Sequence, residues 1–150
     1  KECRVLRKVK VFRSGGALHF PEEVLFPGYF FIRTACPKAL EEELKRSGDF
    51  PQFPSVIPVE PADLAFLKDI CGEELERPMG VTRLILDGDN RIIQADGILN
   101  RYLDRIVKLN LHRRFALVET ALFGRVQPVL FGVTLEQDGR FCPVRTVRAG

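Results

Sequence analysis

The chain has 150 residues, of which 45% are hydrophobic and 29% are charged, a composition typical of a folded globular protein and not of a disordered or fibrous one. Its longest apolar runs, such as Tyr29-Phe30-Phe31-Ile32, are far too short to span a bilayer, so we expect no membrane contact. No signal peptide opens the sequence, and we therefore expect a cytoplasmic protein.

The net charge of +3 is unevenly distributed along the chain. Residues 1–13 carry six basic groups and one acid, residues 14–90 carry seven basic groups and fourteen acids, and residues 91–125 carry seven basic groups and three acids. These segments therefore have net charges of +5, −7 and +4. Two basic ends around an acidic middle indicate contact with a polyanion at one or both ends, but a charge count also fits a solvated basic surface.

Residues 1–72 are predicted to form a domain of mixed helices and strands. Strands are predicted at residues 4–12, 18–25 and 29–33. Ser14-Gly15-Gly16 provides the glycines of a hairpin turn. Helices are predicted from Pro37 to Gly48 and from Pro61 to Gly72, since proline favours helix starts and glycine favours helix ends. This order indicates an α+β fold in which helices cover a small antiparallel sheet.

Residues 73–80 are polar and irregular, and we predict a linker there. Beyond it, short strands alternate with turns, which is typical of a small β-barrel over residues 81–137. The barrel strands are predicted at residues 81–86, 91–94, 104–109, 115–121 and 126–130. Residues 138–150 are predicted to be a basic tail.

The residues show no pattern typical of a catalytic, metal or cofactor site. The two histidines are His19, expected as an exposed strand residue, and His112, and no serine or cysteine stands in a nucleophile motif. The cysteines stand far apart, so free and mostly buried thiols are expected. They are Cys3, Cys36, Cys71 and Cys142. We predict a non-enzymatic protein without metal or cofactor.

Two separated motifs resemble the NusG family of transcription elongation factors. Leu25-Phe26-Pro27-Gly28-Tyr29-Phe30-Phe31-Ile32 resembles the Phe-Pro-Gly-Tyr signature of the amino-terminal (NGN) domain of that family. Leu122-Phe123-Gly124-Arg125-Val126-Gln127-Pro128-Val129 resembles the Phe-Gly-Arg…Pro-Val stretch of its carboxy-terminal KOW domain. The resemblance covers roughly residues 2–136 and implies an NGN α/β sandwich followed by an SH3-like KOW β-barrel.

Within the family, the chain is most similar to the specialised LoaP-type antiterminators. The similarity lies in Glu2-Cys3, in Glu22-Glu23-Val24-Leu25 and in Leu111-His112-Arg113-Arg114-Phe115-Ala116. The NGN domain of the family normally begins with a strand and a helix that would precede Lys1, so the NGN resemblance is incomplete at its start. The resemblance implies a processive antitermination factor, expected to be a monomer, that binds bacterial RNA polymerase and suppresses pausing and termination.

The resemblance also implies which residues contact polymerase and DNA. The polymerase clamp would be bound by Phe26, Pro27, Gly28 and Tyr29. The non-template DNA strand would be contacted by Arg46 and Ser47. Because Pro-Gly breaks the strand, we expect Phe26 and Tyr29 to turn outward as an exposed apolar patch and Phe30 to pack in the core. Core packing of all these aromatic residues is the alternative.

Binding of a nascent RNA hairpin through the KOW domain is implied for LoaP-type proteins. The candidate RNA-binding residues are Arg101, Arg105, Lys108, His112, Arg113, Arg114 and Arg125. Residues 110–114 join two predicted strands, so Arg113 and Arg114 are expected at an exposed tip, where guanidinium groups suit phosphate. A solvated basic surface is the alternative interpretation. The alternative function is that of a general NusG-type factor whose KOW domain recruits a termination factor or a ribosomal protein.

Overall fold

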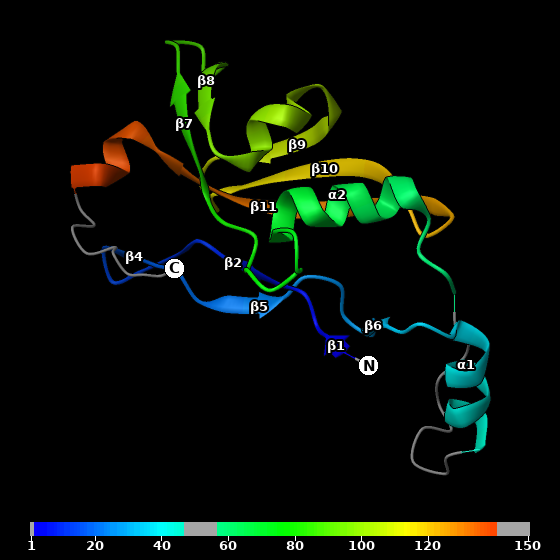
Figure 1. Ribbon diagram of the computed structural model, residues 1–150. Coiled ribbons are helices and arrows are strands. Elements are labelled where there is room, and N and C mark those ends of the chain that lie inside the picture. The colour runs from blue at the N-terminus through cyan, green and yellow to red at the C-terminus, as the bar shows by residue number, and fades with distance from the viewer. Residues whose placement is uncertain (1, 47–56, 141–150) are drawn as a thin grey trace.

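The computed structural model describes residues 2–46 and 57–140, and it shows a mixed α+β fold in which strands predominate (Figure 1). The described residues form three two-stranded sheets, one curled five-stranded sheet, two α-helices and two short 3-10 segments. The α+β class predicted from the sequence is therefore confirmed at this level.

The first strands of the chain pair as three successive antiparallel ribbons. The strands are β1 (Glu2–Arg4), β2 (Arg7–Val9), β3 (Phe12–Ser14), β4 (Ala17–His19), β5 (Glu22–Val24) and β6 (Phe31–Arg33). β3 pairs with β4 across the predicted glycine turn, β2 pairs with β5, and β1 pairs with β6. The predicted continuous strands over 4–12 and 18–25 are thus interrupted. One interruption lies at Pro21, which accepts a hydrogen bond from the Lys10 amide at 2.8 Å but has no N–H to return.

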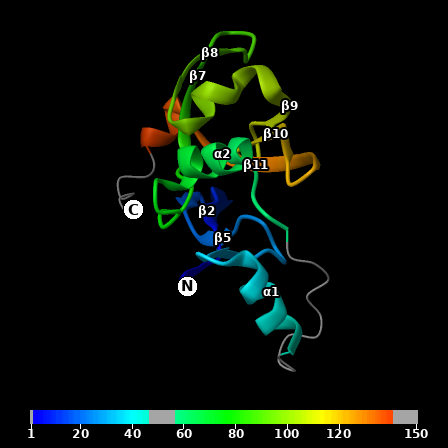
Figure 2. The ribbon, with the colours of Figure 1, turned by 45° about the vertical axis from the view of Figure 1, so that its right-hand side comes forward.

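Both helices begin at the predicted prolines. They are α1 (Pro37–Arg46) and α2 (Pro61–Cys71). α2 ends where Gly72 adopts a φ of 89° and donates its N–H to the Lys68 carbonyl. α1 stands apart from the rest of the molecule (Figures 1 and 2), whereas α2 lies alongside the five-stranded sheet.

The five-stranded sheet has the order β8-β7-β11-β10-β9. Its strands are β7 (Thr82–Leu86), β8 (Ile92–Asp96), β9 (Ile106–Asn110), β10 (Phe115–Leu122) and β11 (Arg125–Leu135). The 3-10 segment η1 (Ile98–Arg105) joins β8 to β9, so the strand predicted from Asp104 begins later, at Ile106. β11 extends beyond the predicted end at Leu130 because Phe131, Val133 and Leu135 continue its buried alternation.

Helix α2 and the five-stranded sheet share one hydrophobic core. Phe66 of α2 packs edge-to-face on Tyr102 of η1 at a centroid distance of 5.2 Å, and Tyr102 lies 5.9 Å from Phe131 of β11. Phe131 has no exposed surface and belongs to the same cluster of buried residues as Phe66. The predicted domains 1–72 and 81–137 therefore pack against each other in the part of the chain that the structure describes. The division into two domains stays a prediction.

The segment predicted as a linker, 73–80, contributes to this core. Met79 is fully buried, its carbonyl accepts the Val9 amide at 2.8 Å, and its own amide donates to the Arg7 carbonyl at 2.9 Å. β2 therefore lies against the segment that leads into β7. The predicted tail also begins in ordered structure, because Asp138 is buried in the 3-10 segment η2 (Glu136–Arg140).

Candidate functional site

The turn between β9 and β10, residues 111–114, is built on a network of hydrogen bonds. The Asn110 side chain accepts the Arg113 amide at 2.8 Å. Arg114 adopts a φ of 59°, and its carbonyl accepts the Val133 amide of β11 at 3.0 Å. These hydrogen bonds connect the turn to the sheet and hold the backbone of its tip residues in position.

Arg114 is buried, which contradicts the expectation that it stands at an exposed tip. Its side chain is 4% exposed and forms a two-point ion pair with Asp138, with Nε and Nη2 at 2.9 and 2.8 Å from the two carboxylate oxygens. Arg114 also donates to the Leu111 carbonyl. The physical reason is that Asp138 compensates the buried charge at close range. Arg114 therefore supports the turn and offers no surface to a ligand in this arrangement.

Asp138 depends on this pair to remain charged in the interior. Burial raises the pKa of its carboxyl group, but hydrogen bonds from Arg114 and from the Leu135 amide at 2.7 Å, together with the Arg114 charge, outweigh burial. The net result is a pKa below the usual value for aspartate. The Arg13 charge also lowers this pKa.

Three of the predicted RNA-binding residues remain exposed on β9 and its turn. Lys108, His112 and Arg113 are exposed and form no ion pair with any described residue. Lys108 lies opposite Leu117 in the β9–β10 register, whereas His112 and Arg113 occupy the turn. The structure thus leaves a small basic surface at the end of the sheet where β9 meets β10.

Arg101 and Arg105 lie apart from the turn, near α2. Arg101 pairs with Asp69 of α2, whose carboxylate also accepts the Tyr102 hydroxyl. Arg105 donates to Thr120 at 3.2 Å, and its guanidinium lies 5.6 Å from the centre of the Tyr102 ring. Both arginines are exposed, but these contacts direct them toward η1 and α2.

Arg125 lies at the opposite end of the hairpin from Arg113. The eight residues of β10 separate the two turns, which is about 23 Å at the usual strand rise. Arg125 Nη2 approaches the Tyr29 hydroxyl at 3.4 Å. The structure therefore does not bring the predicted RNA-binding residues into one patch.

The aromatic residues of the Phe-Pro-Gly-Tyr segment form a cluster with the β10–β11 turn. Phe26 is 5% exposed and packs edge-to-face on Phe123 at 5.5 Å, and Tyr29 stacks on Phe123 at 5.1 Å. Phe31 completes the cluster at 5.7 Å from Phe123. The expectation that Phe26 turns outward is wrong, and Tyr29 is half-buried.

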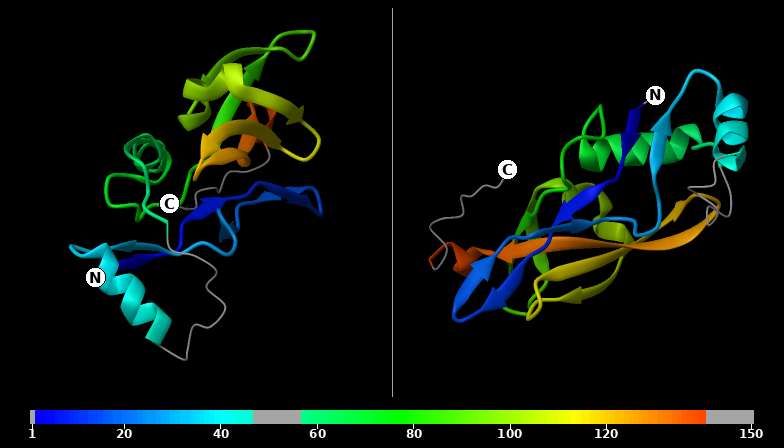
Figure 3. Two further views of the ribbon diagram at one scale, coloured as in Figure 1. Left: turned by 90° about the vertical axis from the view of Figure 1, so that its right-hand side faces the viewer. Right: turned by 90° about the horizontal axis from the view of Figure 1, so that it is seen from below.

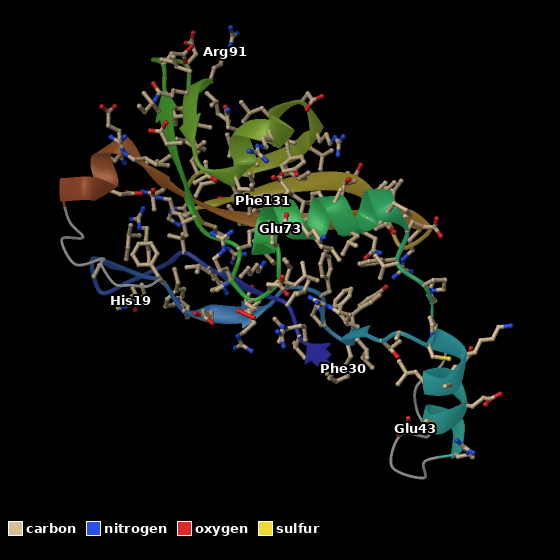
Figure 4. The ribbon with its side chains drawn as sticks, viewed as in Figure 1. His19, Phe30, Glu43, Glu73, Arg91 and Phe131 are labelled. Atoms are coloured by element: carbon tan, nitrogen blue, oxygen red, sulfur yellow. The ribbon has the colours of Figure 1, made fainter. Side chains whose placement is uncertain are left out.

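The turn at Pro27-Gly28 explains this inward orientation. The Tyr29 amide donates to the Phe26 carbonyl at 3.1 Å, and Gly28 adopts a φ of 88°, so the chain folds back and both aromatic rings reach Phe123. Pro27 and Gly28 themselves are exposed. Phe30, which was expected in the core, is 53% exposed instead and lies at the surface in Figure 4.

Two acidic residues hold the segments together and were missed in the sequence. Asp63 of α2 is buried and accepts the Phe123 amide at 3.0 Å, and Asp69 binds η1 as described above. Asp63 precedes Phe66, Leu67 and Ile70 by three, four and seven residues, so helical spacing places it on the buried face of α2 and was a signal for its contact. The sequence offers no comparable signal for Asp69. Of the predicted DNA-contacting residues, Arg46 is exposed at the end of α1, and Ser47 lies outside the described residues.

The cysteines differ in their surroundings. Cys3 and Cys36 are free and exposed, contrary to the expectation of mostly buried thiols, whereas Cys71 is free and buried. Burial raises the pKa of the Cys71 thiol to about 11, and the Arg77 charge only partly offsets this. Cys142 lies outside the described residues.

Within residues 2–46 and 57–140, no group of three or more His, Cys, Asp or Glu side chains is arranged so that it could hold a metal ion.

His19 is exposed in β4, as predicted. Among the described residues, no helix has the length and apolar character needed to cross a membrane.

A scan against protein-family models found no family that matches this chain, and a search of curated proteins found no relative.

Proposed function

We propose that this protein is a non-enzymatic, NusG-type transcription antitermination factor that binds RNA through the β9–β10 turn and RNA polymerase through the region around Tyr29. In this proposal the curled five-stranded sheet is a KOW barrel, and the preceding strands and helices belong to an NGN domain. The order of the two sequence motifs supports this assignment. The observation that carries the RNA-binding function is the exposed pair His112 and Arg113 on a turn held by the buried Arg114–Asp138 ion pair.

A rigid turn favours binding of phosphate. Arg113 has its backbone fixed by Asn110, so less conformational freedom of the backbone is lost when its guanidinium binds a phosphate. Guanidinium groups present several donors that match phosphate oxygens. Lys108 extends the positive charge along β9. Since the major groove of an RNA helix is too narrow for side-chain readout, we expect the turn to recognise the shape and backbone of a hairpin.

Contact with polymerase would use the exposed residues of the aromatic segment. Pro27 and Gly28 are exposed and Tyr29 is half-buried, so these three residues form the accessible edge of the Phe26–Phe123 cluster. Phe30, the next residue of the chain, is exposed as well. Phe26 itself would reach a partner only if the β10–β11 turn moved away from it. Exposed aromatic side chains are frequent anchors of protein interfaces.

Binding of a labelled RNA hairpin to the purified chain tests the RNA-binding function. Arg113→Ala should weaken binding at least about tenfold, because loss of one charge-assisted contact costs about 1.5–3 kcal/mol and about 1.4 kcal/mol is a factor of ten. Arg91→Ala is the matched control, since Arg91 is also an exposed arginine but lies at the distant β7–β8 turn (Figure 4). Equal affinities for the two variants would contradict the assignment of the turn.

A protein-recruiting barrel is the second candidate function. Ile93 of β8 and Val107 of β9 are 65% and 53% exposed, and β8 and β9 are the two edges of the sheet. Exposed apolar residues on sheet edges favour a protein partner. Salt distinguishes the two functions: RNA binding through phosphates weakens steeply as salt rises, whereas docking of apolar surfaces does not.

A further inference from the structure

A second basic residue lies near the β9–β10 turn although it is about one hundred positions away in the chain. Arg13 belongs to the β3–β4 hairpin. In Figures 1 and 3 this hairpin occupies the same end of the molecule as η2, the segment that contains Asp138. The sequence alone gives no reason to associate Arg13 with the turn.

Contacts at Gly132 position the β3–β4 hairpin beside the turn. A Cβ built on Gly132 would lie 2.9 Å from the Val9 carbonyl and 3.2 Å from the Val11 side chain, so the chain leading into β3 runs directly over β11 here. Gly132 is paired with Phe115, the first residue after the turn. Arg13 follows Val11 by two residues. It therefore lies close to the end of the sheet that carries the β9–β10 turn.

The electrostatic effect of Arg13 on Asp138 also indicates that Arg13 lies near the β9–β10 turn. The influence of Arg13 on Asp138 places its guanidinium within electrostatic range of the Arg114–Asp138 pair. Because Arg114 neutralises Asp138, that carboxylate leaves little negative charge to hold Arg13. Among the described residues, Arg13 forms no salt bridge and is exposed, whereas Lys8 and Lys10 of the same chain segment both approach Glu23.

We propose that Arg13, His112 and Arg113 form one composite surface that binds the phosphates of an RNA stem. This proposal rests on the RNA-binding function proposed above. Two guanidinium groups from separate hairpins suit the backbone of a stem, in which phosphates of both strands are available. Because Arg13 belongs to the first part of the chain and Arg113 to the barrel, RNA bound to both stabilises their packing.

Equilibrium binding of a labelled RNA hairpin, with a stem of about one helical turn, tests the composite surface. Phosphate contacts are independent of base sequence, so a generic stem at low salt is sufficient. Arg13→Ala and Arg113→Ala should each weaken binding about tenfold, and each should reduce the slope of log affinity against log salt by about one. Arg13→Lys should retain most of the affinity. Lys38→Ala, an exposed basic residue of α1, is the control and should change neither quantity.

The outcomes separate the two proposals. If Arg113→Ala weakens binding and Arg13→Ala does not, the composite surface is refuted and the RNA-binding turn remains. If the unmodified chain does not bind the hairpin at all, the proposed function fails and the composite surface fails with it. Thermal unfolding of Arg13→Ala should match that of the unmodified chain, because Arg13 is exposed. If Arg13→Glu binds as well as the unmodified chain, the composite surface is also refuted.

Discussion

Removal of the Asp138 carboxylate should strongly destabilise the protein. The carboxylate accepts two hydrogen bonds from Arg114 and one from the Leu135 amide, at 2.7–2.9 Å. Asp138→Ala removes all three acceptor interactions and leaves the Arg114 guanidinium, which is 4% exposed, without its counter-charge. Breaking a buried ion pair on one side costs about 3–5 kcal/mol.

This loss is a large part of the stability of a small protein. Unfolding of a typical domain costs about 5–15 kcal/mol, and each kcal/mol changes the melting temperature of a chain of this size by about 2–4 °C. We therefore expect Asp138→Ala to melt about 6–20 °C below the unmodified chain. Glu136→Ala is the matched control, since Glu136 is an exposed acid of the same 3-10 segment and should change stability by less than about 0.5 kcal/mol.

Urea unfolding followed by circular dichroism measures the effect, and its pH dependence adds an independent check. The pKa of Asp138 is lowered in the folded state, so the pair contributes its full stability above the unfolded pKa. That contribution is lost as the pH falls through the folded pKa. Asp138→Asn should lack this part of the acid sensitivity, and Arg114→Met with Asp138→Leu should recover much of the stability at neutral pH.

A free energy of unfolding for Asp138→Ala within about 1 kcal/mol of that for Glu136→Ala at neutral pH would refute the burial of this ion pair, because loss of one partner of a buried pair costs more than that. The same pH profile for Asp138→Asn and the unmodified chain would also refute it. Either result means that Arg114 is solvated and that the β9–β10 turn has another support.

Two further predictions concern packing and thiol reactivity. Gly132→Ala would place a Cβ 2.9 Å from the Val9 carbonyl oxygen, so we expect the free energy of unfolding measured with urea to fall by about 1–3 kcal/mol. An unchanged urea midpoint would mean that β2 does not lie against β11. Iodoacetamide at mildly alkaline pH should modify exposed Cys3 and Cys36 in the native chain and spare Cys71, whose pKa is raised to about 11 by burial. Peptide mass spectrometry measures this, and equal rates at all three thiols would contradict the burial of Cys71.

Local features of the fold were predictable because their causes are local. Pro61 and Gly72 delimit α2 through the proline N1 preference and the left-handed region open to glycine, and both act within one turn of helix. Gly15 and Gly16, with φ of 62° and 79°, form the predicted hairpin turn for the same reason. The β9–β10 turn was also expected from its position between two strands.

Local sequence signals therefore predict the helices, the hairpin turns and the approximate strands, because propensities and turn preferences depend on neighbouring residues. The inward orientation of Phe26 and the burial of Arg114 depend instead on contacts between distant parts of the chain. Phe26 is covered by Phe123 and Arg114 is neutralised by Asp138. Whether an aromatic ring or a guanidinium meets water depends on such distant partners, and no local pattern contains them.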